Sequence, residues 1–408
     1  MQPMKIVVFA EMFLPHVDGV TNSLVHLTRE FTRQGHEVLV ITPKAKGSNA
    51  VKLKGIKIIF LPSIPAVVYP EIMIGVFSRE LFSVLRKFSP DIVHVIGPGT
   101  VGSMGLFYSK LVNIKSIAAF HGYFMEPEYL RVWGIKNRGV ETAQKLLWKL
   151  AKTFYDRADA VITPSNFVKN DLLDHDFSSP INVIRNAVDF SNIGLDKEEQ
   201  KAFIKKYSLS KSKVILYVGR VSLEKNIEIL IKSFAIVATR VPDLKFLIVG
   251  GGPDLKRLQK LALDRGLENQ VIFSGELKNL DLVKKGIFKL AKVFVTASHS
   301  EVQPVSIIEA MNFGLPIVAV HSRGLVEMIQ ENGCLVNGDD INEFSDKISA
   351  ILLDEKLQKK MSRKSTQLVK EYSITNSAKQ HLELYKKLII QKKERKSVGK
   401  YLKSKIGR

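Results

Sequence analysis

The chain has 408 residues, of which 45% are hydrophobic and 25% charged, a composition typical of a globular protein long enough for two domains with separate cores. Its single cysteine, Cys334, excludes an intramolecular disulfide and a cysteine-rich zinc site, and it fits a reducing compartment. The net charge of +21 favours an acidic lipid surface or a phosphorylated ligand over nucleic acid, because no zinc-finger spacing or aromatic-basic RNA-binding segment appears. A Lys-rich composition without functional meaning remains the alternative.

No segment is suited to cross a membrane or to direct secretion. No apolar run approaches the roughly 18 residues that span a bilayer. The apolar stretch Met4–Ala10 is too short for the core of a secretory signal, and Glu11 follows it at once. We therefore expect a cytoplasmic protein that is either soluble or bound to a membrane peripherally.

Strands and helices alternate through the first half of the sequence. The predicted strands are Lys5–Ala10, Glu37–Thr42, Ile56–Leu61, Asp91–Ile96, Ser116–Phe120 and Ala160–Thr163. The predicted helices are Gly19–Gln34, Gly99–Val112 and Lys136–Asp156. Such alternation predicts a parallel sheet with helices on both faces.

The pattern restarts after a polar, Lys-rich segment at 191–212, which is either a linker or an extra helix. The strands predicted beyond it are Val214–Val218, Leu244–Val249, Val271–Phe273, Val293–Thr296 and Ile317–Val320. The sequence thus predicts two α/β domains of the doubly wound, Rossmann-like type, at 1–190 and 213–370, with a C-terminal helix and basic tail at 371–408. We expect the ligand site in the cleft between the two domains.

One strand–loop–helix–strand segment of the second half carries two carboxylates. It lies between the predicted strands that end at Thr296 and begin at Ile317, and Pro304 suits the first turn of its helix. Glu301 lies in the loop, and Glu309 lies in the apolar helix, where a lone charge needs solvent or a partner. Because open α/β folds bind ligands at the carboxyl edge of the sheet, this pair is a candidate site.

Cations follow the first predicted strand of the second domain. Arg220 and Lys225 lie in a Gly-Arg-Val-Ser-Leu-Glu-Lys segment that begins at Gly219 and opens a helix. A guanidinium fork, an ammonium and a helix N-terminus converging at a strand end suit a diphosphate. Taken alone, the segment is equally consistent with surface cations beside a turn.

Four further positions at predicted strand ends are weaker candidates. Gly251 lies in a Gly-Gly-Gly-Pro turn, Gly275 in a Phe-Ser-Gly-Glu segment, and Gly19 in the loop after the first strand. A glycine there permits close approach of the backbone to a ligand, although a plain tight turn explains each one equally well. His121 follows the strand that ends at Phe120, and a lone histidine is more often structural.

Together these motifs resemble a known family. Glu301 and Glu309, with Ala-Met directly after Glu309 and Gly-Leu-Pro further on, resemble the Glu-x7-Glu motif of the family-4 retaining glycosyltransferases, whose GT-B fold has two Rossmann-like domains facing each other across a deep cleft. The segment ending at Lys225 is similar to the family's Gly-Arg-x-x-x-Glu-Lys. The Asn-Ala-Val-Asp ending at Asp189 is similar to the sequence that precedes its second domain. The resemblance covers nearly the whole chain.

The resemblance implies a role for each candidate residue. The catalytic set would be His121 and Glu301 against the transferred sugar, with Arg220 and Lys225 on the donor diphosphate. The residues implied in donor binding are Gly19, Gly219, Gly251, Gly275, Gln303, Val305, Ser306 and Glu309, of which Glu309 binds the ribose and several act through backbone amides. Pro304 departs from the family pattern, because it lacks the N–H that the usual glycine offers.

The activity implied is transfer of a hexose from a nucleotide-diphospho-sugar, of the UDP-glucose or GDP-mannose type, with retention of anomeric configuration. The resemblance implies no metal and no cofactor, since the nucleotide-sugar is a substrate. A sugar-nucleotide epimerase of the same fold and a binding protein with an inactive site remain alternatives, because fold does not determine function. A dinucleotide oxidoreductase is disfavoured, since no G-x-G-x-x-G follows the first strand.

The acceptor is expected to be a membrane glycerolipid, with a soluble sugar or a polysaccharide as the alternative. The Glu-Val-Gln of the motif is similar to the glycolipid-synthesising branch, whose members act on diacylglycerol-type or phosphatidylinositol-type lipids. Tyr69–Phe88 is predicted to be an apolar helix edged by cations, and Arg131–Arg157 mixes aromatic and basic residues. The tail Lys386–Arg408 is rich in Lys and Arg. These features predict a peripheral enzyme on the inner face of the cell membrane.

Overall fold

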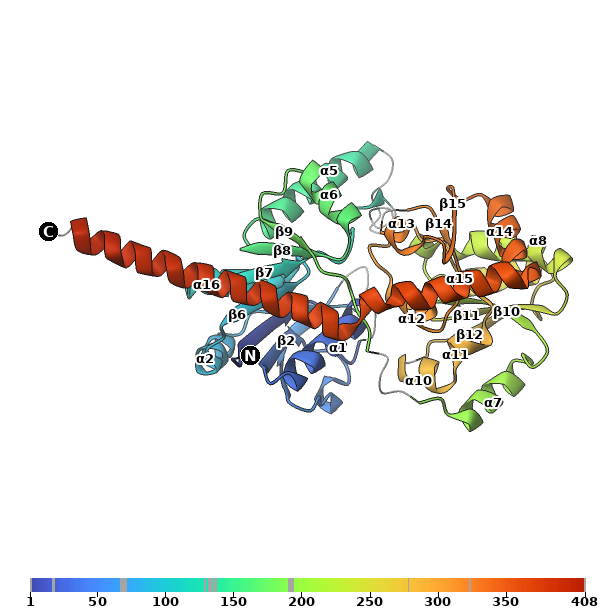
Figure 1. Ribbon diagram of the computed structural model, residues 1–408, viewed down its shortest axis with the longest axis horizontal. Helices are drawn as coiled ribbons and strands as arrows, with labels where there is room; N and C mark the ends of the chain where they lie inside the picture. Colours follow the sequence, from blue (N-terminus) through green and yellow to red (C-terminus); the bar gives the residue numbers. More distant parts are fainter. Residues whose placement is uncertain are drawn as a thin grey trace. The chain divides into compact units, whose positions relative to one another are not determined.

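The computed structural model describes residues 2–16, 19–66, 72–127, 130, 135, 138–189, 194–277, 279–322 and 324–406. The chain divides into two compact units (Figure 1). The first unit comprises residues 1–121, 130–187 and 374–408, and the second comprises residues 122–129 and 188–373. The C-terminal segment therefore belongs to the first unit.

The first unit is built on a seven-stranded sheet in the order β3-β2-β1-β6-β7-β8-β9. Its strands are β1 (Lys5–Ala10), β2 (Glu37–Pro43), β3 (Ile56–Leu61), β6 (Ile92–Ile96), β7 (Lys115–Ala119), β8 (Ala160–Thr163) and β9 (Ile181–Val183). All neighbouring strands are parallel. The central strands read as nearly continuous apolar runs because helices cover both faces of the sheet.

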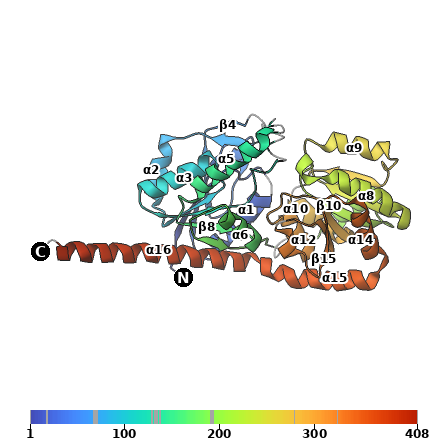
Figure 2. The same cartoon turned by 90° about the horizontal axis from the view of Figure 1, so that it is seen from above.

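The helices of the first unit lie on the two faces of this sheet. They are α1 (Gly19–Arg33), α2 (Arg79–Phe88), α3 (Thr100–Leu111), α5 (Arg138–Tyr155), α6 (Asn166–Asp174) and α16 (Ile374–Ile406). Figure 2 shows α16 below the sheet and α2, α3 and α5 above it. The α16 helix packs on α1, with the rings of Phe31 and Tyr385 5.8 Å apart, and Ala378 and Leu382 are fully buried in the core.

The predicted helix over Tyr69–Phe88 is wrong in its first part. Met73–Gly75 forms the short strand β5, which pairs antiparallel with β4 (Ser63–Pro65), and α2 begins only at Arg79. Glycine disfavours a helix interior, and a Cβ on Gly75 would lie 2.5 Å from Val101 Cγ2, so the backbone packs directly against α3. Residues 67–71 lie outside the described part of the chain.

The second unit contains a six-stranded parallel sheet in the order β12-β11-β10-β13-β14-β15. Its strands are β10 (Lys213–Val218), β11 (Leu244–Val249), β12 (Val271–Gly275), β13 (Val293–Thr296), β14 (Ile317–Val320) and β15 (Gly333–Val336). Its helices are α7 (Lys197–Lys206), α8 (Ile227–Arg240), α9 (Leu255–Asp264), α10 (Asn279–Lys284), α11 (Ile287–Leu290), α12 (Val305–Asn312), α13 (Leu325–Met328), α14 (Ile341–Leu353) and α15 (Glu355–Leu368).

The fold class is as predicted: each unit is a Rossmann-like α/β structure with a parallel sheet. The segment read as a linker or extra helix contains α7, which lies in the second unit. Among the helices that the structure describes, none combines the length and the apolar character needed to cross a bilayer.

Candidate functional site

The loop between β13 and α12 lies at the carboxyl edge of the second sheet. Pro304 takes the N-cap position of α12 with φ −69° and ψ 126°, so the helix proper begins at Val305. Its ring fixes φ where the chain turns into the helix, and no intrahelical bond requires its missing N–H. The helix ends at Asn312, and Gly314, two residues beyond it, has a φ of +69°, the left-handed conformation that commonly follows a helix end.

The loop after β10 lies at the same edge, because β10 and β13 are parallel neighbours. Lys225 from this loop and Glu301 from the β13–α12 loop form an ion pair, with Nζ 2.6 Å from Oε1. Both side chains are mostly buried, at 18% and 17% exposure. The structure therefore joins two residues that the sequence places 76 positions apart.

Three strand-end loops are held together by backbone hydrogen bonds around these residues. The N–H of Val221 donates to the carbonyl of Gly251 at 2.8 Å, and the N–H of Gly250 donates to the carbonyl of Gly275 at 3.0 Å. A Cβ on Gly250 would lie 1.8 Å from the carbonyl oxygen of Gly219, so glycine is required for this close approach. Predicted donor-site glycines thus meet at one edge of the sheet.

The other predicted donor residues lie on the same loop and helix. Glu309 and Gln303 are each 6% exposed, which means that the Glu309 carboxylate is not a solvated surface group. Val305 and Ser306 are the first two residues of α12. The first amides of a helix lack intrahelical partners and favour an anion by the helix dipole, so they suit a phosphate or a sugar oxygen.

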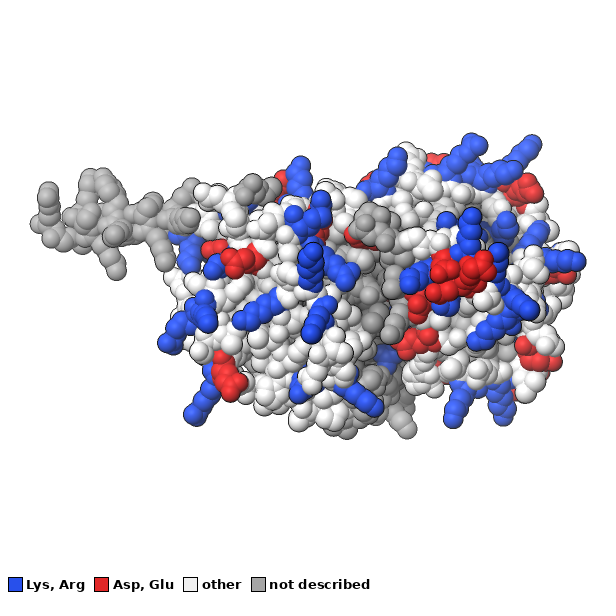
Figure 3. All heavy atoms as spheres, turned by 90° about the horizontal axis from the view of Figure 1, so that it is seen from below, with Lys and Arg blue, Asp and Glu red and all other residues white. Residues whose placement is uncertain are grey.

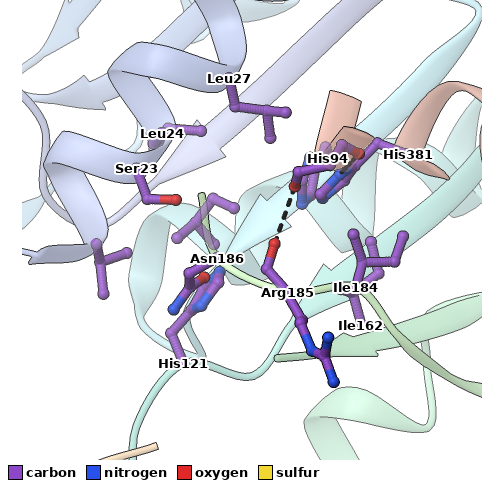
Figure 4. Close-up of a pocket in the computed structure, with 13 residues that line it drawn as sticks. Ser23, Leu24, Leu27, His94, His121, Ile162, Ile184, Arg185, Asn186 and His381 are labelled. Carbon is purple, nitrogen blue, oxygen red and sulfur yellow. Dashed lines mark hydrogen bonds between the residues drawn. The ribbon is translucent and has the colours of Figure 1, made fainter. Parts of the chain in front are cut away.

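Two predicted site residues lie in the first unit. Gly19 is the first residue of α1 and is exposed, while residues 17 and 18 of its loop lie outside the described chain. His121 follows β7 and lines a small cavity of about 20 Å³. Figure 4 shows His121 beside Asn186 at one edge of this cavity, with His94 and His381 on the side of α16.

His94 and His381 line the same cavity and form a buried polar cluster with Tyr385. The Tyr385 hydroxyl lies 2.7 Å from His94 Nδ1, and the two imidazole rings are 5.7 Å apart. Burial lowers the pKa of His94 well below its usual value, and the neighbouring His381 and His121 lower it further. Burial also lowers the pKa of His381 to about 4, against the opposing effect of its hydrogen bond to the Ser377 carbonyl.

This cluster predicts acid sensitivity of the fold. Between the unfolded pKa near 6.5 and the folded value near 4, the unfolded chain binds a proton at His381 that the folded chain does not. Stability is therefore lost as pH falls through this window, by about 3 kcal/mol in total for His381. We expect the fall in unfolding temperature between pH 7 and pH 5 to be smaller in His381→Gln than in the wild type.

A matched control separates the effect of His381 protonation from the effect of lost side-chain packing. Leu382→Ala removes a buried side chain from the neighbouring position of α16 and should lower the unfolding temperature by similar amounts at both pH values. An unchanged pH dependence in folded His381→Gln, measured by circular dichroism, would contradict this assignment.

The sequence analysis missed Glu11, which lies directly after β1. Its Oε1 accepts a hydrogen bond from the Gly102 N–H at 2.6 Å, and its Oε2 accepts one from the Val101 N–H at 3.3 Å. Burial raises the pKa of Glu11 to about 7, although the amides of Gly102, Val101 and Gly99 oppose this shift. The sequence contains one indication of this contact, a G-x-G-x-x-G motif that follows the fourth predicted strand, Asp91–Ile96, rather than the first.

The structure places the predicted residues in two separate groups. Gly219, Arg220, Lys225, Gly251, Gly275, Glu301, Gln303, Val305, Ser306 and Glu309 belong to the second unit, and Gly19 and His121 belong to the first. Across the described ranges, no three His, Cys, Asp or Glu side chains are grouped so that they could hold a metal ion.

Two family models match the chain, one in each half. The model described as Glycosyltransferase Family 4 matches residues 17–192, and the model described as Glycosyl transferases group 1 matches residues 198–368. The matched regions contain nearly all of the candidate residues described above.

Similar curated proteins extend over most of the chain. A GDP-mannose-dependent alpha-mannosyltransferase of Corynebacterium glutamicum is 27% identical over 382 residues, which are 91% of this chain and 86% of that protein. An alpha-monoglucosyldiacylglycerol synthase of Streptococcus pneumoniae is 26% identical over 344 residues, or 82% of this chain and 76% of the relative.

Solved structures have the same fold. A glycosyltransferase of Rickettsia africae aligns with a TM-score of 0.75 at 20% identity, covering 95% of this chain and 99% of that one. The Anabaena protein HepE, solved in complex with UDP, aligns with a TM-score of 0.73 at 17% identity, covering 94% and 100%. With matching family models in both halves and two Rossmann-like units, the chain belongs to the family-4 glycosyltransferases of the GT-B fold.

Proposed function

We propose that the protein transfers a hexose from a nucleotide-diphospho-sugar to a membrane glycerolipid, with retention of the anomeric configuration. The observation that carries the donor half of this proposal is the Lys225–Glu301 ion pair at the carboxyl edge of the second sheet, with Arg220 in the same loop after β10 as Lys225. Cations and a carboxylate held together there suit a donor in which a diphosphate is bonded to a sugar.

The leaving group of the reaction is a nucleoside diphosphate on which negative charge develops. Arg220 and Lys225 would stabilise that charge, and the first amides of α12 at Val305 and Ser306 would add the dipole of the helix. In the structure Lys225 pairs with Glu301, so donor binding would turn the ammonium towards the diphosphate and free the carboxylate for a sugar hydroxyl. These protein cations would supply the charge for which other transferases use a metal ion.

The buried Glu309 would bind the ribose. A carboxylate offers several hydrogen-bond acceptor sites, and a pair of ribose hydroxyls offers two donors. Gly219, Gly251 and Gly275 would let the neighbouring backbone approach the nucleotide. In the first unit, Gly19 and His121 would contact the donor sugar.

The lipid half of the proposal rests on the relatives and on the surface of the first unit. One relative is named for a monoglucosyldiacylglycerol product. Large hydrophobic side chains are exposed on β4, β5, α3, α5 and the loop before α2: Ile64, Ile74, Val76, Phe77, Phe107, Leu111, Leu146 and Leu150. Exposed cations lie on α2, α3 and α5: Arg79, Arg86, Lys87, Lys110, Lys145 and Lys149. This combination suits a membrane interface.

The aromatic residues that the sequence analysis placed in this interface are not available to it. Phe154 and Tyr155 are buried, and Trp148 stacks on His175 with ring centroids 3.6 Å apart. They face inward because α5 covers the sheet with its aromatic side. Its outward-facing residues Leu146 and Leu150 are the ones proposed to meet the lipid. Trp133 lies outside the described residues.

On the face seen in Figure 3, the Lys and Arg side chains of the described residues are spread over each unit and are not gathered in one patch. Such a distribution favours adsorption to an anionic surface by the sum of many weak attractions, each about 1 kcal/mol per residue near the lipid.

Co-sedimentation with vesicles tests the membrane proposal. Binding should rise with the fraction of anionic lipid, fall with salt, and weaken when residues 391–408 are removed. A Leu146→Asp, Leu150→Asp double variant should bind less than Leu263→Asp, Leu353→Asp, which changes two equally exposed leucines of the second unit. A protein that ignores anionic vesicles at low salt would contradict the proposal and favour a soluble sugar acceptor.

A further inference from the structure

The loop between β6 and α3 has the sequence Gly97-Pro98-Gly99-Thr100-Val101-Gly102, a G-x-G-x-x-G that follows a strand and opens a helix. In other α/β proteins this loop type receives a phosphate at the helix N-terminus. Its glycines are sterically required here, since a Cβ on Gly102 would lie 2.3 Å from the carbonyl oxygen of Gly97. The loop therefore has the geometry of an anion site within the first unit.

The chain fills this site with its own carboxylate. Glu11 accepts hydrogen bonds from the N–H groups of Gly102 and Val101 at 2.6 and 3.3 Å. A Cβ on Gly99 would lie 2.4 Å from the Glu11 carboxyl carbon, so the loop closes tightly around that group. The amides that a phosphate would use are taken, and a carboxylate stands in the phosphate position.

An open groove of about 630 Å³ begins at the same loop and runs along α3. We call it the α3 groove, and it is lined by Phe77, Pro98, Gly99, Thr100, Ser103, Met104 and Phe107. Phe77 and Phe107 are 51% and 61% exposed. The hydroxyl of Thr100 donates to the Gly75 carbonyl at 2.9 Å, which fixes the β5 side of the groove to α3.

The groove has one polar end and one apolar end. Gly99 belongs both to the groove and to the loop that encloses Glu11, so the carboxylate lies next to the polar end. Met104 and Phe107, further along α3, form apolar walls. A molecule that matches this arrangement has a hydrocarbon chain joined to an uncharged hydroxyl-bearing head.

We infer that the α3 groove binds the acceptor as an uncharged lipid alcohol, and that Glu11 is a specificity-determining residue that rejects lipids with a phosphate headgroup. The inference rests on the proposed lipid acceptor and names its class. A hydroxyl can donate a hydrogen bond to the remaining lone pairs of the Glu11 carboxylate. A phosphate finds the loop amides occupied by Glu11, and above pH 7, where that carboxyl group is ionised, it also meets a like charge. Such repulsion is a common source of discrimination.

Binding of two short-chain lipids without any donor tests the inference independently of catalysis. The probes are dihexanoylglycerol and dihexanoyl phosphatidic acid, which share their acyl chains and differ by a phosphate in place of a hydroxyl. By calorimetry well above pH 7, where Glu11 is ionised, the wild type should bind the uncharged lipid at least about tenfold more tightly than the phosphate. Glu11→Ala, which frees the amides of Gly102 and Val101, should reduce this ratio about tenfold or more. Glu80→Ala, which removes an exposed carboxylate of α2, should not change it.

A second pair of variants tests the groove itself and does not depend on the folding of Glu11→Ala. Phe107→Ser changes a groove wall, whereas Leu263→Ser changes an almost equally exposed residue of α9, outside the groove and outside the proposed membrane interface. Phe107→Ser should weaken binding of both lipids about fivefold or more, and Leu263→Ser should bind them like the wild type.

Each outcome has a separate meaning. Equal or tighter wild-type binding of the phosphatidic acid, or equal effects of Phe107→Ser and Leu263→Ser, would overturn the inference. Binding as expected, in a protein that glycosylates no lipid with any donor, would leave the groove assignment standing and refute the proposed function instead.

Discussion

Replacing Arg220 by alanine is expected to lower turnover by roughly 100-fold or more, because positioned groups that stabilise developing charge typically contribute that much. Arg220 follows β10 at the edge where Lys225 and Glu301 meet, and its guanidinium would hold the leaving diphosphate by two parallel hydrogen bonds. Steady-state kinetics on purified protein measures the effect, and a lysine at this position should restore only part of the rate.

The control for this experiment is Arg265→Ala. Arg265 is an exposed arginine that follows α9 in the same unit, so its loss removes the same charge away from the site. Turnover of this variant should match the wild type. A folded Arg220→Ala enzyme with an unchanged rate would refute the diphosphate assignment.

The second large effect separates the two glutamates by calorimetry. Glu309→Gln should weaken binding of the free nucleoside diphosphate, because the buried carboxylate is assigned to the ribose. Glu301→Gln should lower turnover and weaken binding of the nucleotide-sugar, while the bare nucleotide binds as well as before or better. The gain is possible because Glu301, which lies 2.6 Å from Lys225 in the structure, no longer competes with the diphosphate for the ammonium.

The assignment depends on which ligand each variant binds more weakly, more than on the size of either change in affinity. If Glu301→Gln weakened the nucleoside diphosphate and Glu309→Gln affected only the nucleotide-sugar, the two roles would have to be exchanged. Thermal unfolding of each variant serves as the folding control, since Glu309 is buried and its replacement also perturbs packing.

Pro304 illustrates how a departure from a family motif is resolved by local geometry. The sequence raises the concern that proline removes an N–H from the phosphate-binding loop. In the structure Pro304 is the N-cap of α12, so the amides of Val305 and Ser306 still begin the helix. We therefore propose that these two amides, rather than the amide at position 304, contact the donor.

Most parallel strands of the two sheets were predictable from sequence because they are buried on both faces and read as short apolar runs. The edge strands β9 and β15 were not predicted, since they are largely only partly buried and carry no long apolar run. The segment at Met73–Gly75 was not, since its apolar residues suit a strand and an interfacial helix equally well. Only pairing with Ser63–Pro65 selects the strand. The orientation of the α5 aromatics likewise depends on which side of the helix meets the sheet, and composition does not contain that information.

The position of the candidate donor residues of the second unit at one sheet edge was predictable, because the motifs follow neighbouring strands. The contact between Lys225 and Glu301 is new information, as two separate loops must be folded before it forms. Glu11 was missed because its partners, Val101 and Gly102, lie 90 and 91 positions away. Nothing in its local sequence distinguishes it from an ordinary residue after a strand.

The transfer reaction itself is the most direct test of the account. The purified protein is incubated with a labelled nucleotide-sugar, either UDP-glucose or GDP-mannose, and with vesicles that contain diacylglycerol, in the presence of EDTA. The account predicts label in the organic phase with one of the two donors, in an α-linked product whose configuration is read by proton NMR. Activity that EDTA abolishes and Mg²⁺ restores would contradict the metal-free proposal alone. Label that remains water-soluble with both donors, over vesicles of every composition, would contradict the central claim that the acceptor is a membrane lipid.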